Sequence, residues 1–208
     1  MINDLVTNTI SVAGEVVEDP VLSHTVYGEN FYSFPIKVDR LSGASDVLSC
    51  ILPERLLCCV SKGGAIEVSG QIRSYNRIVN GLNRLDIKIF VREVFSNSFE
   101  NCLNEAMLKG YICKPPVYRV TPFGREITDM LLAVNRAFNK SDYIPVIAWG
   151  RNARLCGKLE IGQKLCVTGR MQSRDYEKTC DGETFTRTAY ELSACTAELL
   201  EENDQYAN

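Results

Sequence analysis

The sequence has very little of the chemistry from which most enzyme active sites are built. Its 208 residues include a single histidine, His24, and no Cys-x-x-Cys pair. No nucleophile stands beside a recognisable general base, and no glycine-rich loop carries a phosphate-binding lysine. Zinc sites need clustered thiolates or imidazoles. We therefore expect no catalytic residue, no metal site and no cofactor, and the sequence predicts a binding protein rather than an enzyme.

Long apolar runs are absent too. The chain has no stretch of eighteen or more apolar residues, so no membrane-spanning helix is expected. Its first residues, Met1 to Asp4, lack the apolar core of a signal peptide. Nine cysteines, an odd number, argue against a closed set of disulfides. We expect a cytoplasmic, nucleoid-associated protein whose cysteines, such as Cys166 and Cys195, are small buried side chains.

Positive charge is scarce overall but unevenly distributed. The formal net charge is −3. Residues 1–100 hold 9 basic and 12 acidic side chains, whereas residues 101–197 hold 14 basic and 10 acidic ones. Four more acids and no base follow in 198–208. A polyanion would therefore prefer the second half of the chain.

What the sequence does contain is an internal repeat. Its first part has a constant spacing of 96 residues, and after a connecting segment the spacing becomes 99. There the run 66–70, IEVSG, matches 165–169, LCVTG. A register shared over about seventy residues with one small slip indicates a duplicated domain. The pairs at the first spacing are Gly14 and Gly110, Pro20 and Pro116, Gly28 and Gly124, and Arg40 and Arg136.

Each copy is expected to consist mostly of β-strands. Leu165, Val167 and Met171 alternate with polar residues, which is typical of a half-buried strand. Asn80-Gly81 stands between two apolar runs and predicts a hairpin turn. In the second copy the expected strands are 106–115, 127–137, 143–150, 164–176 and 185–197, with a helix at 151–159.

Five short strands with a helix between the third and the fourth are typical of an OB-fold. The sequence therefore predicts an all-β protein of two tandem five-stranded OB-fold barrels, each with a short helix between strands 3 and 4. A divergent first domain is expected at 1–97 and a second domain at 104–200. A short acidic tail is expected at 201–208.

Several motifs of the second copy form a recognisable pattern. They are Gly110, Pro116 and Gly124, then 132–136 (LAVNR), 143–151 (YIPVIAWGR) and 162–170 (GQKLCVTGR). With them, nearly all of 105–197 resembles the bacterial single-stranded DNA-binding protein (SSB) family. The resemblance implies binding of single-stranded DNA and pairing of two chains into a homodimer with four barrels. Family members commonly end in an acidic, aromatic-tipped peptide that recruits replication and repair proteins, and 201–208 lacks that tip.

The resemblance also assigns binding roles. The four base-stacking positions of the family fall on Phe138, Tyr143, Trp149 and Tyr176. In the first copy the same positions fall near Ser42, Val47, Pro53 and Arg77, none of which is aromatic. We therefore expect the first copy to serve mainly as a structural half. Its remaining means of guiding a DNA backbone are Arg73, Tyr75, Arg77, Arg84 and Lys88.

Strand parity supports these roles from the residues alone, because side chains two apart share a face. The even-numbered residues of 144–148 are apolar and are expected inside the barrel. The odd-numbered residues are expected to form an exposed strip, which suggests a contact surface. That strip consists of Tyr143, Pro145, Ile147 and Trp149.

The following strand is expected to add positive charge to this surface. Arg170, Gln172, Arg174 and Tyr176 share one parity. Single-stranded nucleic acid needs this mixture of rings, on which bases stack, and cations, which meet phosphates. The phosphate-binding candidates are Arg136, Lys140, Arg151, Arg170, Arg174 and Arg187.

The predicted function is binding of single-stranded DNA without sequence preference, which protects it in replication, recombination or repair. Two alternatives stay open. A primosome-accessory type of OB-fold protein would use the same strip mainly for protein–protein contacts, which suits the acidic first copy. An OB-fold barrel can also bind RNA or oligosaccharide, because the fold alone does not fix the function. Four aromatic positions beside arginines favour single-stranded DNA.

Overall fold

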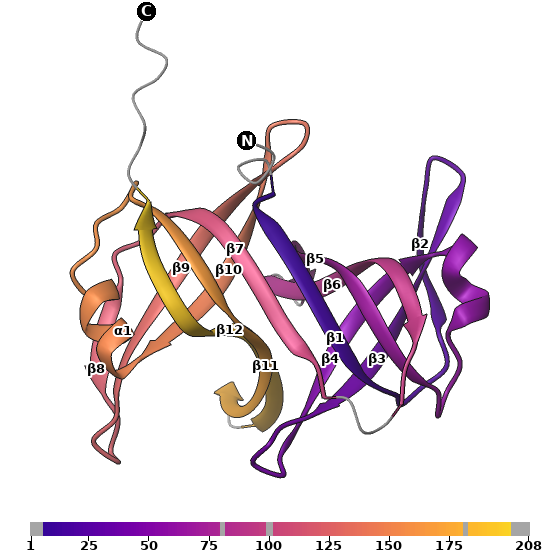
Figure 1. Ribbon diagram of the computed structural model, residues 1–208, viewed down its shortest axis with the longest axis horizontal. Helices are drawn as coiled ribbons and strands as arrows, with labels where there is room; N and C mark the ends of the chain where they lie inside the picture. Colours follow the sequence, from indigo (N-terminus) through magenta and orange to yellow (C-terminus); the bar gives the residue numbers. More distant parts are fainter. Residues whose placement is uncertain (1–5, 80–81, 99–101, 181–182, 201–208) are drawn as a thin grey trace, which may run out of the picture. The chain divides into compact units, whose positions relative to one another are not determined.

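The structure is a computed structural model that describes residues 6–79, 82–98, 102–180 and 183–200 (Figure 1). The expected turn at Asn80-Gly81 and the expected tail lie outside the described residues. None of the helices within the described ranges is long and apolar enough to cross a membrane.

The chain divides into two compact units. The barrel-1 unit consists of 9–106 together with 171–191. The barrel-2 unit contains 107–170, with 6–8 and 192–200. The domain limits expected from the sequence stay a prediction.

The first copy of the repeat folds into a closed barrel. Its elements are β1 (Asn8–Val16), β2 (Val21–Val26), β3 (Glu29–Asp39), β4 (Ser45–Pro53), the 3₁₀ helix η1 (Glu54–Cys59), β5 (Ala65–Val79) and β6 (Leu82–Ser96). The strand order is β2-β3-β4-β6-β5-β1, and β3 pairs back to β1 to close the barrel. β4 and β6 run parallel, while the other pairs of described register are antiparallel.

The second copy repeats this topology strand for strand. Its elements are β7 (Asn104–Ile112), β8 (Val117–Val120), β9 (Glu126–Arg136), β10 (Lys140–Trp149), α1 (Gly150–Cys156), β11 (Lys164–Cys180) and β12 (Glu183–Leu200). The order is β8-β9-β10-β12-β11-β7, and β9 pairs back to β7. β10 and β12 provide the parallel contact.

Strand pairing follows the spacing found in the sequence. The closing contact Glu15↔Lys37 recurs as Tyr111↔Ala133, 96 residues further along. Apart from the edge strands β2 and β8, each copy has the five strands of an OB-fold barrel, with a helical turn between the third and the fourth of these five, so the predicted fold class is confirmed. The edge strand β8 was not predicted, because its exposed side chains give no apolar alternation.

Strand parity places the core where the sequence predicts it. Ile144, Val146 and Ala148 are at most 2% exposed. Leu165 and Val167 are fully buried on β11. Burying each Ile, Val or Leu side chain stabilises the fold by about 1.5–3 kcal/mol. On β10 the same alternation turns Tyr143 and Trp149 outward.

The expectation of buried cysteines is confirmed for only some of them. Cys50 and Cys156 are buried free thiols. The expectation is wrong for exposed thiols such as Cys195, and Cys166 is only half-buried. Both lie in apolar runs, but a run of apolar residues does not reveal which side chains point outward from a strand covered on one face. Among the cysteines whose side chains the structure describes, the exposed thiols are those of Cys58, Cys59, Cys102 and Cys195.

Candidate nucleic-acid interface

The outer face of β10 carries two of the predicted rings near its two ends. Tyr143 is 41% exposed and Trp149 is 36% exposed. Pro145 between them is half-buried, and Ile147 is only 5% exposed, so the prediction of a continuous exposed strip is wrong at Ile147. β10 is a central strand, and Ile147 lies between Asp129 of β9 and Ser193 of β12, whose side chains share its face.

Trp149 is held in one orientation by its neighbours. Its indole Nε1 donates a hydrogen bond to Ser193 Oγ at 3.1 Å. Gly150 follows at a φ of +53°, a left-handed conformation that favours glycine, and turns the chain directly from β10 into α1. The polar edge of the indole is therefore satisfied within the barrel, while part of the apolar ring stays in contact with solvent.

Phe138 lies in the turn between β9 and β10 and is 93% exposed. Its φ is +63°, and Asn139 follows at +52°. A bulky side chain in this left-handed region costs of order 1–3 kcal/mol. The ring contributes almost nothing to the core, so packing does not account for its position. An exposed ring on a strained backbone is the kind of observation that points to a contact function.

Arg136 is committed to a buried partner. Its Nη1 lies 3.3 Å from Oδ1 of Asp142, and the Asp142 side chain is 1% exposed. The first copy has the same pair at the same spacing, because Arg40 Nε donates to Asp46 Oδ2 at 2.6 Å and Asp46 is fully buried. The hydrogen bond to Asp46 raises the pKa of Arg40. These arginines neutralise buried carboxylates at the base of the β3–β4 and β9–β10 turns.

The other predicted cations of the barrel-2 unit are exposed. Lys140 begins β10 directly after the Phe138 turn, Arg151 lies in the first turn of α1 beside Trp149, and Arg170 lies on β11. Lys140 and Arg151 thus each lie two residues after an exposed ring in the sequence.

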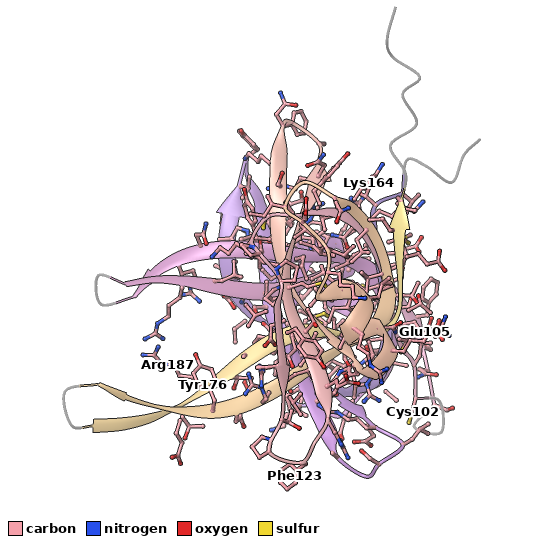
Figure 2. All side chains as sticks on the ribbon, turned by 90° about the vertical axis from the view of Figure 1, so that its left-hand side faces the viewer. Cys102, Glu105, Phe123, Lys164, Tyr176 and Arg187 are labelled. Atoms are coloured by element: carbon pink, nitrogen blue, oxygen red, sulfur yellow. The ribbon has the colours of Figure 1, made fainter. Side chains whose placement is uncertain are left out.

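Three predicted residues lie in the barrel-1 unit instead. Arg174, Tyr176 and Arg187 belong to the β11–β12 hairpin. Figure 2 labels Tyr176 and Arg187 on it. Arg174 and Tyr176 are exposed, and Arg187 is half-buried. The expected parity is broken at Gln172, which is 8% exposed and donates from Nε2 to Glu191 Oε1 at 2.9 Å. Gln172 therefore belongs to the interior of this unit rather than to an exposed row.

The sequence reasoning missed the highly exposed ring of Phe123 in the barrel-2 unit. Phe123 is 92% exposed in the loop between β8 and β9, next to Gly124 at a φ of +74° (Figure 2). Near this loop, Glu126 accepts hydrogen bonds from the Tyr118 hydroxyl at 2.6 Å and from Arg154 Nε at 2.8 Å. These two bonds lower the pKa of Glu126. An aromatic residue directly before a turn glycine was the signal available in the sequence.

The part of the chain that the structure describes contains no group of three or more His, Cys, Asp or Glu side chains that could hold a metal ion. Fold and site together define a tandem OB-fold protein. Its second barrel presents exposed rings and cations from β10, α1 and the β9–β10 turn.

Comparisons with known proteins agree with this class. The single-strand binding protein (SSB) family matches residues 103–200. The single-stranded DNA-binding protein of Clostridium tetani is 35% identical over 82 residues, which are 36% of this chain and 57% of that protein. Single-stranded DNA-binding protein 2 of Streptococcus agalactiae is 33% identical over 111 residues, which are 50% of this chain and 82% of that protein. The chain thus belongs to the single-strand binding protein family.

The likeness extends to a solved structure over the whole chain. Wild-type single-stranded DNA-binding protein from Thermus aquaticus matches with a TM-score of 0.77 and 20% identity, covering 97% of this chain and 96% of that one. At this identity the likeness concerns the fold. The chain spans about half the length of several curated relatives, including those of Clostridium tetani and Staphylococcus aureus.

Proposed function

We propose that the protein binds single-stranded DNA without sequence preference, mainly through the barrel-2 unit. The observation that carries the proposal is the exposure of three rings, Phe138, Tyr143 and Trp149, around one strand of this barrel. The family match covers residues 103–200, and relatives of the chain are named single-stranded DNA-binding proteins. Every base has a flat face, so rings bind single strands of any sequence.

Each element of the site would have a distinct task. Bases would stack on the three rings, and each stacked base would stabilise the complex by about 1–3 kcal/mol. Lys140, Arg151 and Arg170 would meet phosphates. Arg136 would contribute less, because it already neutralises Asp142.

The β11–β12 hairpin would add further contacts of the same kind. Tyr176 provides an exposed ring, and Arg174 provides an exposed cation two residues before it. Arg187 would add a phosphate contact from the opposite strand of the hairpin. The proposed contacts of the barrel-2 unit are therefore Phe138, Tyr143, Trp149, Lys140, Arg151 and Arg170, with Arg136 in a supporting role. Those of the hairpin, which belongs to the barrel-1 unit, are Tyr176, Arg174 and Arg187.

The biological setting follows from the same chemistry. A protein that coats single strands without reading sequence would protect them during replication, recombination and repair. We further propose that two chains pair as a homodimer with four barrels, as the resemblance to tandem members of the family implies. A solution mass equal to one chain at micromolar protein concentration would contradict the dimer.

The single tryptophan allows a direct test. Titration with oligo-dT should quench Trp149 emission strongly, and the affinity should fall as salt rises. Trp149→Ala and Tyr143→Ala should each weaken binding by roughly 5-fold to 150-fold, which corresponds to about 1–3 kcal/mol. Binding of the variants can be followed by anisotropy of a labelled oligonucleotide.

The matched control is Tyr27→Ala, which removes a fully exposed ring at the β2–β3 turn of the first barrel. It should leave the affinity unchanged. Trp149 emission that stays constant over a wide range of DNA concentration would refute the proposed function.

A further inference from the structure

The first barrel carries rings at positions where the second barrel has none. Pro53 takes the place of Trp149, but its cross-strand partner on β3 is Phe31, where the second barrel has Ile127. Similarly, Ile51 of β4 lies beside Phe90 of β6, where the second barrel pairs Ile147 with Ser193. β4 of the first barrel therefore lacks the ring that β10 carries, but both of its neighbouring strands, β3 and β6, carry rings beside it.

These rings contact one another across three strands. His24 of β2 stacks on Phe31, with ring centroids 5.1 Å apart and planes within 9°. Phe31 in turn contacts Phe90 at 5.9 Å with a tilt of 38°. His24 is exposed, and both phenyl rings are half-buried on the outer face. Together, His24, Phe31 and Phe90 form what we call the ring ladder of the first barrel.

A hollow of about 290 Å³ adjoins the ring ladder. His24 and Ile51 are part of its wall, so the ladder and the outer face of β4 both reach it. Its size is at the small end of ligand pockets and suits one planar ring system. The polar and aromatic residues that line it include His24, Tyr75, Asn76, Arg77, Asp86 and Lys88.

Two cations, Arg77 and Lys88, line this hollow together with the carboxylate of Asp86. Arg77 is 65% exposed and its Nη1 lies 3.4 Å from Asp86 Oδ2, while Lys88 Nζ lies 4.0 Å from the same atom. Further along β5 and β6, Arg73 and Arg92 both donate to Gln71 Oε1. Four cations thus share this face with Asp86, although residues 1–100 as a whole hold more acids than bases.

We propose that the ring ladder and its hollow form a second single-stranded DNA surface, which receives a base beside His24 and Phe31 and the adjoining phosphates on Arg77 and Lys88. This inference rests on the proposed function, and it adds contacts in the first barrel. A stacked pair of rings beside cations on the outer strands of an OB-fold barrel is the combination that single strands require.

A tryptophan placed in the ladder tests the proposal in the full chain. Combining Trp149→Phe with Phe31→Trp leaves position 31 as the only indole. Oligo-dT of about 32 nucleotides, enough for two OB folds at about 16 each, should quench this indole in a salt-dependent manner. Emission at position 31 that stays constant while labelled DNA binds would overturn the proposal and point to another occupant of this face, such as a protein.

A charge variant provides a second readout that does not depend on a ring substitution. Replacing both cations of the hollow, Arg77→Ala with Lys88→Ala, should lower the slope of log affinity against log salt by about 0.7 for each lost phosphate contact. The control Tyr27→Ala should not change the slope. An unchanged slope in the double variant would contradict the proposal.

The two proposals fail separately. If DNA leaves the emission at position 31 unchanged but quenches Trp149 normally in the unmodified chain, only the second surface is overturned. No DNA response at either indole would overturn both.

Discussion

Phe138 is a side chain whose position packing does not explain. Its ring is almost fully exposed, and its backbone is held in a left-handed conformation that bulky residues avoid. Natural proteins often retain such strain at binding sites, where stability and activity are in conflict. The two properties should therefore separate on mutation.

Phe138→Gly should raise the free energy of unfolding by up to about 1 kcal/mol, because glycine adopts a positive φ without strain but adds freedom to the unfolded chain. The same change should weaken DNA binding. Urea denaturation and oligonucleotide anisotropy measure the two effects. Ala137→Gly, next to it but without a positive φ, should instead lower stability slightly, and a loss of stability in Phe138→Gly would show that the turn is not strained.

The buried pair of Arg136 and Asp142 should behave as a structural unit. Arg136→Ala leaves a buried carboxylate without its partner and should cost about 3 kcal/mol of unfolding free energy. Adding Asp142→Asn should restore much of that loss, because the buried negative charge is removed. Denaturation midpoints of the single and double variants test this coupling. Equal stability of the single and double variants would mean that Arg136 is not needed by Asp142.

At the scale of elements, the β11–β12 hairpin depends on a carboxylate of the first barrel. Asp46 Oδ1 accepts a hydrogen bond from the Ser173 backbone N–H at 2.7 Å, and Val47 N–H donates to Ser173 Oγ at 3.2 Å. Arg40 reaches the Ser173 carbonyl at 3.4 Å. All these residues belong to the barrel-1 unit. The hairpin base is thus fixed by a polar cluster rather than by apolar packing alone.

Asp46→Ala should therefore release the base of this hairpin. Amide hydrogen exchange around Ser173 should accelerate markedly. Without the Asp46 carboxylate, fewer hydrogen bonds must break before the base of the hairpin opens. Affinity for single-stranded DNA should fall as well, since Tyr176 and Arg174 lose their support. Asp39→Ala, which removes an exposed carboxylate at the end of β3, is the control and should leave exchange at Ser173 unaltered.

Element boundaries and strand faces were accessible from the sequence to different extents. The inward residues of β10 were predicted correctly, because alternation along one strand is a local pattern. The burial of Ile147 and Gln172 was not, because it depends on side chains of adjacent strands and of the partner Glu191. The rings at positions 31 and 90 were overlooked for a related reason, since each lies one strand away from the position that the second copy uses.

At the scale of the whole molecule, two buried thiols should make the free energy of unfolding decrease at alkaline pH. Burial raises the pKa of Cys156 to about 11 and raises that of Cys50 further. A thiol in the unfolded chain ionises near pH 8.5. The unfolded state therefore loses protons first, and the free energy of unfolding should fall as pH rises from about 9 toward 11.

Denaturant titrations at several pH values check this slope. Cys156→Ala should make the decline shallower, whereas Cys195→Ala, which alters an exposed thiol, should leave it unchanged. A decline that is identical in both variants would mean that Cys156 does not contribute to it.

The duplicated architecture was the most predictable property of the chain. A constant spacing of glycines and prolines marks turns, and turns fix the order of strands. The structure then shows the same closure contacts 96 residues apart. The ligand of each barrel was harder to predict from the sequence. It depends on the side chains of the outer faces, which can vary without changing the backbone fold.

The paired closure contacts have a consequence for engineering. The strands before the helix in each barrel share one register, 96 residues apart, so an outer-face residue of one barrel can be substituted into the matching position of the other. Pro53→Trp with Glu54→Gly would transplant the indole platform and its turn onto β4, next to a ring ladder that is already there. In a chain of this kind, the number of barrels designed to bind single-stranded DNA and the affinity of each would be adjustable one barrel at a time.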